Sequence, residues 1–372
     1  MRIFRKKTLE TILHGSDKKT LKPTMRTFDL VLLGVGSVIG SGILVLTGEA
    51  SSKAGPSVIF SFLIAGLACG LTALCYAELS SAIPSSGSVY TYSYMTLGEI
   101  VAHSMGWLLG GSYIIAGAAI ANGWSSYFKN LLEGFGVIVP KEFTSLPSEG
   151  GYGNLLAISV VLLIMIVLFK GTSSSKFVNN FMVVIKIAVI VLFVLVGVFY
   201  VKPHNWTNDF APQGLSGIMV GATTVFFAYL GFDTISTSAE ETINPQKSLP
   251  RAIIITLLIC TAFYIIVCLV LTGMVPYSQL GKGDALAYVL EEVGQDKIAG
   301  IISLGAVIGL LAGPLATMFA SIRILFTMSR DGLLLKKEVY VNGAISRQPL
   351  QMSSVRWDAA CSNFPHISRV RL

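Results

Sequence analysis

Charged residues are scarce in this chain of 372 residues. Asp, Glu, Lys and Arg make up 13% of it, and hydrophobic residues make up 53%. Soluble globular domains carry about 25% charged residues, so this composition excludes an ordinary water-soluble domain. The proportions are typical of a membrane protein.

Cysteine and histidine are also few, with 5 and 4 copies, and no CxxC pair or Cys/His metal spacing occurs. HExxH, GxSxG and the P-loop are absent, which argues against the enzymes that depend on them. Gly34, Gly36 and Gly40 only approach a dinucleotide fingerprint, and they lie in an apolar stretch. We therefore predict a protein that is not an enzyme and has no metal or cofactor.

Long intervals without formal charge are the dominant feature of the sequence. Eight of them reach the roughly 20 apolar residues that a membrane-spanning helix needs, and none shows the alternation of a barrel strand. We predict an all-α integral membrane protein with eight transmembrane helices. The predicted spans are about 28–48, 56–82, 97–129, 153–170, 177–201, 214–240, 251–275 and 298–328.

Basic residues predict the orientation. Residues 1–26 contain eight Lys or Arg against Glu10 and Asp17, and such an excess stays on the cytoplasmic side. We predict a cytoplasmic N-terminal segment over 1–26, a transmembrane core over 27–334 and a cytoplasmic tail over 335–372. The net charge of +7 then indicates orientation and attraction to a lipid surface, without a nucleic-acid partner.

The first span contains GSVIGSGI (36–43), within a 19-residue interval that holds five glycines. Each glycine weakens a helix by roughly 1 kcal/mol relative to alanine. Open backbone in a bilayer is tolerated only where it lines a cavity or packs on protein, so we predict a helix break here. The alternative is that the small residues only allow close helix packing.

The sixth span reads GATTVFFAYLGFDTISTSAE (221–240), and it interrupts apolar sequence with Gly231 and Asp233. It lies five spans after the first. Paired interrupted helices in two inverted repeats mark the midplane site of a transporter. We therefore predict that helices one and six are both discontinuous.

Backbone N–H and C=O groups that have no intrahelical partner at two such breaks can bind a zwitterion. The N–H groups after the first break can hold a carboxylate, as helix N-termini do, and carbonyls at both breaks can accept hydrogen bonds from an ammonium group. The predicted ligand is an amino acid. The predicted substrate-binding residues are Val38, Ile39, Gly40, Ser41, Gly42, Ile43, Phe227, Ala228 and Leu230.

Two charged residues inside the spans are expected to have a structural or functional role, because an unpaired charge at mid-bilayer costs from about 3 to over 10 kcal/mol. Lys186 lies deep in span five, where burial suits it to exchange a proton; alternatively it bonds backbone carbonyls structurally. Asp233 can cap the second half of span six or titrate. We name both as candidates for proton coupling.

Several long motifs resemble the amino acid-polyamine-organocation (APC) permeases, and the chain is most similar to bacterial relatives of cationic amino acid transporters. The resemblance runs over about 20–334. The segments that carry it, besides the span around Lys186, are GVGSVIGSGILVLTG (34–48), CYAELSSAIPSSGSVYTYSY (75–94), FFAYLGFDTISTSAEETINPQKSLPRAI (226–253) and RILFTMSRDGLL (323–334).

This resemblance implies a broken-helix, inverted-repeat carrier in the cell membrane that imports an amino acid with protons. By the same resemblance Phe227 helps to gate the site, and Lys186 is the lysine of the proton-coupled branch. Glu78 and the turn over 84–90 belong to a cytoplasmic loop signature, with a role in helix termination and gating support.

The chain departs from this branch at two places. Gly111-Ser112-Tyr113 stands where many members have Leu-Glu-Tyr, so an acid is missing and we expect a neutral substrate, with branched-chain amino acids as candidates. After 334 the resemblance stops, and no later interval reaches 18 apolar residues. We expect a C-terminal truncation, by frameshift or gene model, which keeps the binding residues and impairs transport; a genuine regulatory tail is the alternative.

Two other classes of function remain open at this point. A membrane sensor or receptor would bind an amino acid at the same breaks without translocating it. A structural or chaperone-like membrane subunit would bind none. The sequence makes no prediction of oligomeric state.

Overall fold

The computed structural model describes residues 6, 23–40, 42–134, 136–137, 139–144, 151, 153–169, 172–207 and 209–333. These residues form helices and no β-strand, apart from one isolated parallel bridge between Met25 and Thr242. The α-helices are α2 (Thr27–Val38), α3 (Thr47–Ala54), α4 (Val58–Ala82), α5 (Val89–Thr96), α6 (Glu99–Gly134), α7 (Leu155–Phe169), α8 (Thr172–Gly197), α9 (His204–Thr207), α10 (Gly214–Phe226), α11 (Pro245–Met274), α12 (Ala285–Glu292), α13 (Asp296–Leu310) and α14 (Ala312–Arg330).

Short 3₁₀ and π segments link or extend these helices. The π-helix is η1 (Gly42–Leu46), and the 3₁₀-helices are η2 (Gly55–Ser57), η3 (Lys141–Phe143), η5 (Val198–Tyr200), η6 (Phe227–Tyr229), η7 (Phe232–Glu241) and η8 (Tyr277–Gln279).

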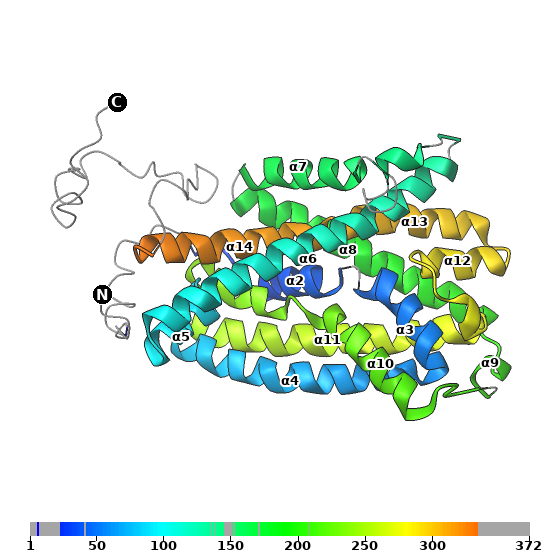
Figure 1. The fold of residues 1–372 in the computed structure, drawn as a ribbon, viewed down its shortest axis with the longest axis horizontal. Coiled ribbons are helices and arrows are strands. Elements are labelled where there is room, and N and C mark those ends of the chain that lie inside the picture. The colour runs from blue at the N-terminus through cyan, green and yellow to red at the C-terminus, as the bar shows by residue number, and fades with distance from the viewer. Residues whose placement is uncertain are drawn as a thin grey trace.

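The long helices lie roughly side by side along the longest axis of the molecule, with α2 in the middle of the bundle (Figure 1). α2 packs against α8, α11, α14 and η7, and α11 also packs along α4. The outer helices are apolar on both faces. On α4, for example, Ala65, Cys69 and Ala73 are buried, whereas Leu67 and Leu71 are exposed, as expected of a helix that faces lipid.

Six helical stretches within the described ranges, some of them built from several consecutive helical segments, are long and apolar enough to cross a membrane. They are Gly42–Ala82, Glu99–Gly134, Phe177–Tyr200, Gly214–Glu241, Pro245–Met274 and Asp296–Arg330, and the shorter apolar helices are Thr27–Val38 and Leu155–Phe169. Each predicted interval contains helix, but the count of eight crossings stays a prediction.

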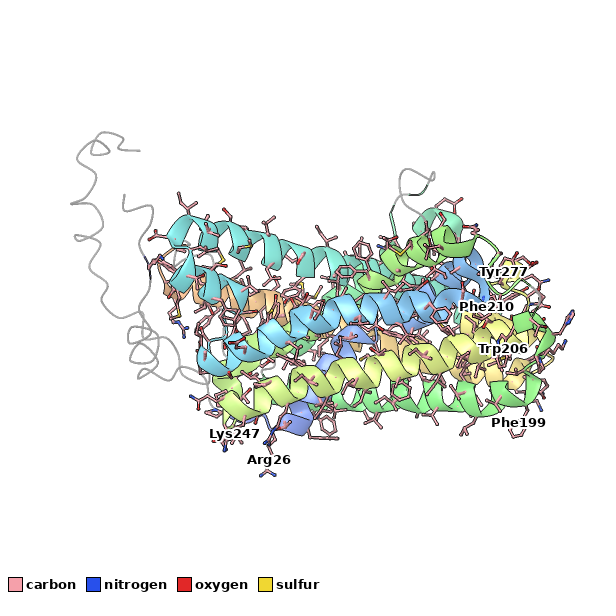
Figure 2. All side chains as sticks on the ribbon, turned by 90° about the horizontal axis from the view of Figure 1, so that it is seen from below. Arg26, Phe199, Trp206, Phe210, Lys247 and Tyr277 are labelled. Carbon is pink, nitrogen blue, oxygen red and sulfur yellow. The ribbon has the colours of Figure 1, made fainter. Side chains whose placement is uncertain are left out.

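The two ends of the bundle differ in their side chains. Arg26 and Lys247 lie at one end, and Phe199, Trp206 and Tyr277 lie at the other (Figure 2). Aromatic residues gather at membrane–water interfaces, and basic residues mark the cytoplasmic side. The basic end contains the start of α2, which is the end that the sequence predicts to be cytoplasmic.

The helix of the first predicted span stops where its glycines cluster. α2 ends at Val38, and its C-cap Ile39 has φ −76° and ψ 62°, outside the helical region. Helical structure resumes as a π-helix at Gly42 and continues as α3 from Thr47. Glycine lowers the cost of leaving the helix, because it favours no single backbone conformation.

The sixth predicted span is interrupted as well. α10 ends at Phe226, and Gly231 adopts φ 113° between two 3₁₀ segments. The second segment, η7, is ten residues long, although 3₁₀ runs beyond 3–4 residues are uncommon. The hydroxyls of Thr234, Ser236 and Thr237 each donate to the carbonyl three residues earlier, at 2.6 Å, which supports the tighter turn.

We predict that Gly231→Ala destabilises the protein more than Gly294→Ala. Both glycines have positive φ, where an L-residue costs roughly 1–2 kcal/mol. An added Cβ at Gly231 would also lie 3.1 Å from Cβ of Ser37, whereas Gly294 has open space. Thermal unfolding in detergent measures both variants. Equal midpoints would show that the contact with Ser37 contributes nothing.

Candidate functional site

The two helix interruptions lie against each other. An added Cβ at Gly42 would lie 2.7 Å from Cβ of Ala228 and 3.0 Å from Oη of Tyr264. Gly231 approaches Ser37 at the end of α2 in the same way. The two breaks therefore contact each other through positions where only glycine fits.

One tyrosine hydroxyl joins the two breaks. Oη of Tyr264, on α11, lies 2.9 Å from the Val38 carbonyl oxygen and 2.6 Å from the Ala228 carbonyl oxygen. A phenol has a single O–H to donate, so the two carbonyls share it. The ring is fully buried, stacks on Phe62 at 4.9 Å and meets Tyr229 edge-on at 5.2 Å. These contacts fix the hydroxyl between the breaks.

A buried ammonium group caps the end of α2. Lys186 of α8 is 1% exposed, and its Nζ donates to the carbonyls of Gly36, at 3.2 Å, and Ile39. The C-terminus of a helix carries a partial negative charge and unsatisfied carbonyls. Lys186 therefore compensates both at the point where α2 is interrupted.

Side chains also bond the carbonyls beyond the first break. The Tyr127 hydroxyl of α6 donates to the Leu44 carbonyl at 2.8 Å, and the Thr47 hydroxyl donates to the Ile43 carbonyl at 2.6 Å. Together with Tyr264 and Lys186, these bonds provide donors for the irregular backbone between α2 and α3. Such donors are needed because water is scarce in this part of the bundle.

Asp233 lies in the first turn of η7, just after the second break. The Tyr113 hydroxyl of α6 donates to its Oδ2 at 2.5 Å. A carboxylate near the start of a helix also meets the positive end of the backbone dipole. The position fits both roles that the sequence leaves open, namely capping and proton exchange.

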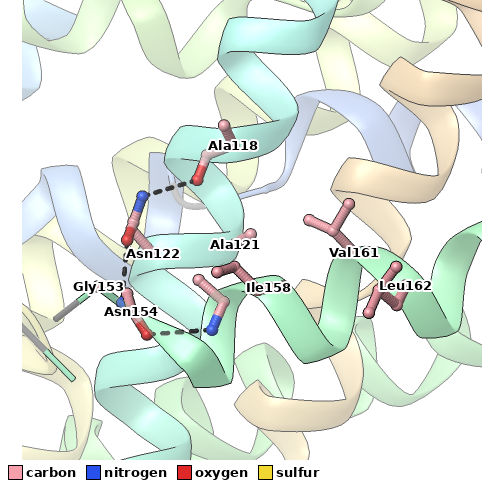
Figure 3. A pocket seen from close by; sticks show the side chains of 9 residues that line it. Ala118, Ala121, Asn122, Gly153, Asn154, Ile158, Val161 and Leu162 are labelled. Atoms are coloured by element: carbon pink, nitrogen blue, oxygen red, sulfur yellow. Dashed lines mark hydrogen bonds between the residues drawn. The ribbon is translucent and has the colours of Figure 1, made fainter. Parts of the chain in front are cut away.

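A separate cavity of 390 Å³ lies between α6 and α7 (Figure 3). Its polar lining consists of Asn122 and Asn154, and Asn154 Nδ2 donates to Asn122 Oδ1 at 2.9 Å. Asn154 Oδ1 accepts from the Ala157 amide at 3.0 Å. None of the predicted site residues lines it. Within the described ranges, no three His, Cys, Asp or Glu residues gather closely enough to hold a metal ion.

A family model described as amino acid permease matches residues 25–350. The chain belongs to the amino acid permease family. This permease is 52% identical over 335 residues to the methylthioribose transporter of Bacillus subtilis, covering 89% of the chain and 72% of that relative. It is 45% identical over 338 residues to the branched-chain amino acid permease BcaP of Bacillus subtilis, covering 89% and 72%.

Human cationic amino acid transporter 4 is a more distant relative, 37% identical over 345 residues. The match covers 90% of this permease and 54% of the human protein, so the chain spans about half the length of that relative. The resemblance to APC permeases, and to cationic amino acid transporters in particular, is thus confirmed. The family and the long apolar helices identify a multi-pass membrane protein.

The predicted substrate-binding residues occupy two different environments in this permease. Phe227 and Leu230 are 66% and 44% exposed, and the Phe227 carbonyl accepts from the Leu230 amide at 3.3 Å. Ser41 lies outside the described residues. The remaining predicted residues are buried at the breaks, namely Val38, Ile39, Gly40, Gly42, Ile43 and Ala228.

Two neighbouring residues of the third predicted span, Ser112 and Tyr113, differ in burial. Tyr113 is buried and contacts Asp233, whereas Ser112 is exposed and donates to the Leu109 carbonyl of its own helix at 2.8 Å. The structure places Tyr113, and not Ser112, beside the second break. The substitution at Ser112 therefore gives little support to a neutral substrate.

Tyr264 is the site residue that reasoning from the sequence missed. It lies in the apolar stretch CTAFYIIVC (260–268), which has the composition of an ordinary membrane span. A phenol in the middle of such a stretch needs a hydrogen-bond acceptor that a regular helix does not supply. The sequence therefore indicates that Tyr264 has a hydrogen-bond acceptor outside its own helix, but it does not indicate which group that is.

We predict that Tyr264→Phe strengthens amino acid binding, because the Val38 and Ala228 carbonyls lose the hydroxyl that competes with the substrate ammonium. Loss of such a hydrogen bond costs the free protein about 0.5–1.5 kcal/mol of stability. The matched control is Tyr229→Phe, which removes a bond to the Phe62 carbonyl at 3.0 Å, away from Val38. Ligand-induced thermal stabilisation measures binding, and weaker binding in Tyr264→Phe or an equal change in the two variants would contradict this role.

Proposed function

We propose that this permease carries out secondary active transport of an amino acid across the cell membrane. The observation that supports this most is the convergence of two interrupted helices on one hydroxyl, that of Tyr264. The substrate ammonium replaces this hydroxyl as donor to the Val38 and Ala228 carbonyls. The carboxylate then accepts from the backbone N–H groups of Gly42 and Ile43, after the first break.

This proposal includes the broken-helix, inverted-repeat fold. In it, α2, η1 and α3 form one discontinuous crossing, and α10, η6 and η7 form another. With α4, α6, α7, α8, α11 and the α13–α14 pair, the described residues make eight crossings. The end with Arg26 and Lys247 faces the cytoplasm, in line with its basic residues.

Transport is coupled to protons through Lys186 in this proposal. Its ammonium holds the Gly36 and Ile39 carbonyls, so protonation strengthens the hold on the end of α2 and deprotonation releases it. Substrate affinity at the break and the proton affinity of Lys186 are therefore coupled, because both depend on the same conformation of the end of α2. Asp233 is a second candidate for the proton, through its contact with Tyr113.

The substrate is a neutral amino acid in this proposal, with branched-chain side chains as the first candidates. Two relatives support this, the branched-chain permeases BcaP of Bacillus subtilis and of Lactococcus lactis, at 45% and 35% identity. The methylthioribose transporter of Bacillus subtilis, at 52% identity, and human cationic amino acid transporter 4, at 37% identity, represent two competing substrate classes.

We predict that leucine, isoleucine and valine displace radiolabelled leucine from the purified 372-residue chain, and that arginine and lysine displace it weakly. Scintillation proximity measures binding, and uptake into proteoliposomes measures flux separately. Saturable binding without flux would favour a sensor. Stronger displacement by arginine would overturn the neutral substrate, and absence of binding by any amino acid would overturn the proposed function.

We predict that leucine binding takes up a proton and that Lys186→Met abolishes this uptake. A pH-indicator dye in weakly buffered detergent solution measures it without requiring flux. The control is Lys202→Met, because Lys202 is an exposed lysine in the loop before α9. Unchanged proton uptake in a Lys186→Met variant that still binds leucine would exclude Lys186 as the coupling group.

A further inference from the structure

The last two residues of η7 each form an ion pair with α14. Glu241 pairs with Arg323, and the two side chains are 2% and 0% exposed. Glu240 pairs with Arg330, and these side chains are 17% and 31% exposed. Two adjacent acids thus join the same pair of elements, one pair sealed from solvent and one in partial contact with it.

The sealed pair belongs to a larger junction. The Glu241 carbonyl accepts from the amides of Thr24 and Met25 at 2.8 and 2.9 Å, and the Met25 carbonyl accepts from the Ile243 amide at 2.8 Å. The Arg323 guanidinium also stacks over Phe319 at 4.4 Å. Glu241 therefore ties the segment before α2, the end of η7 and α14 to one another.

The partly exposed pair joins η7 and α14 to a different third segment. Glu240 accepts from both terminal nitrogens of Arg330 at 2.8 Å, and from the Ser86 amide at 3.2 Å. Beside it, the Tyr90 hydroxyl of α5 donates to Asp331 at 2.9 Å. Glu240 therefore fastens the loop before α5 and the end of α14 to η7.

The two ion pairs differ in the free-energy cost of separating their charges. Parting Glu241 from Arg323 leaves two charges in a site without water, and such a change is strongly unfavourable. Nε and Nη1 of Arg323 and Oε2 of Glu241 are already buried without partners, so further loss of bonding there is not tolerated. Separating Glu240 from Arg330 breaks two bonds between side chains that are 17% and 31% exposed, and because water can reach both groups it costs less than separating the sealed pair.

We propose that the Glu240–Arg330 pair is a releasable latch at the basic end of the bundle and that the Glu241–Arg323 junction is a fixed pivot. Release of the latch lets the loop before α5 and the end of α14 move from η7, which opens a path from the helix breaks to the cytoplasm. This proposal rests on the proposed function for its direction, but the motion itself requires no substrate.

Cys69 provides a natural reporter for this motion. It is 2% exposed on α4, and α4 packs against η7. In the full chain, replacing the exposed Cys75 and the tail Cys361 with serine leaves Cys69 and the buried α11 cysteines, Cys260 and Cys268. Mass spectrometry of the α4 peptide then follows the reaction of Cys69 with N-ethylmaleimide.

We expect Arg330→Gln and Glu240→Gln to speed the labelling of Cys69 by about two- to five-fold, the factor that corresponds to losing an ion pair of this kind. The double reversal Glu240→Arg with Arg330→Glu restores the slow rate. The matched control, Lys53→Gln, breaks the exposed Lys53–Glu49 pair and leaves the rate unchanged. Arg323→Gln lowers the thermal unfolding midpoint.

Unchanged labelling in both single latch variants, or an equal increase in Lys53→Gln, would overturn the latch. An Arg323→Gln variant as stable as wild type, with faster labelling than Arg330→Gln, would reverse the assignment of latch and pivot. Labelling is measured without amino acid, so a failed latch is distinguishable from a failed proposed function, which leucine binding reports.

Discussion

Backbone carbonyls that leave a helix inside a membrane protein must find donors from elsewhere in the chain, because the surrounding lipid supplies none. At the first break these donors are Tyr264 and Lys186, and at the second break Tyr264 serves again. The packing of α8 and α11 around α2 follows from this need. Without the two side chains, the Gly36, Ile39 and Ala228 carbonyls would lose these donors, whereas the Val38 carbonyl would keep the Gly40 amide at 2.8 Å.

The same arrangement makes the breaks suited to a ligand. The Tyr264 hydroxyl has one O–H for two carbonyl acceptors, and the Val38 carbonyl also accepts from the Gly40 amide at 2.8 Å. An ammonium group has three N–H donors and can bond both fully. In the proposed function, the substrate ammonium replaces this hydroxyl at the two carbonyls, and its binding recovers part of the cost of keeping the breaks.

Much of this arrangement could be predicted from the sequence. Composition indicated the membrane, and the motifs indicated the permease family. Gly40, Gly42 and Gly231 lie at the interruptions that their positions suggested, because glycine is the residue that leaves a helix most easily. Lys186 could be predicted to have a polar partner, because a charge in an apolar span needs one. Ser112 was misleading, since its side chain faces outward from α6, and helix orientation is not readable from a single substitution.

The sequence by itself determined that the chain enters a membrane and where its helices are weakest, because hydropathy and glycine content act locally along the chain. Only the tertiary structure decided which groups meet at those weak points. Tyr264, Arg323 and Glu241 are distant in sequence from the backbone or partner they bond. Their roles depend on which faces of the helices pack together, and that is settled by the whole bundle at once.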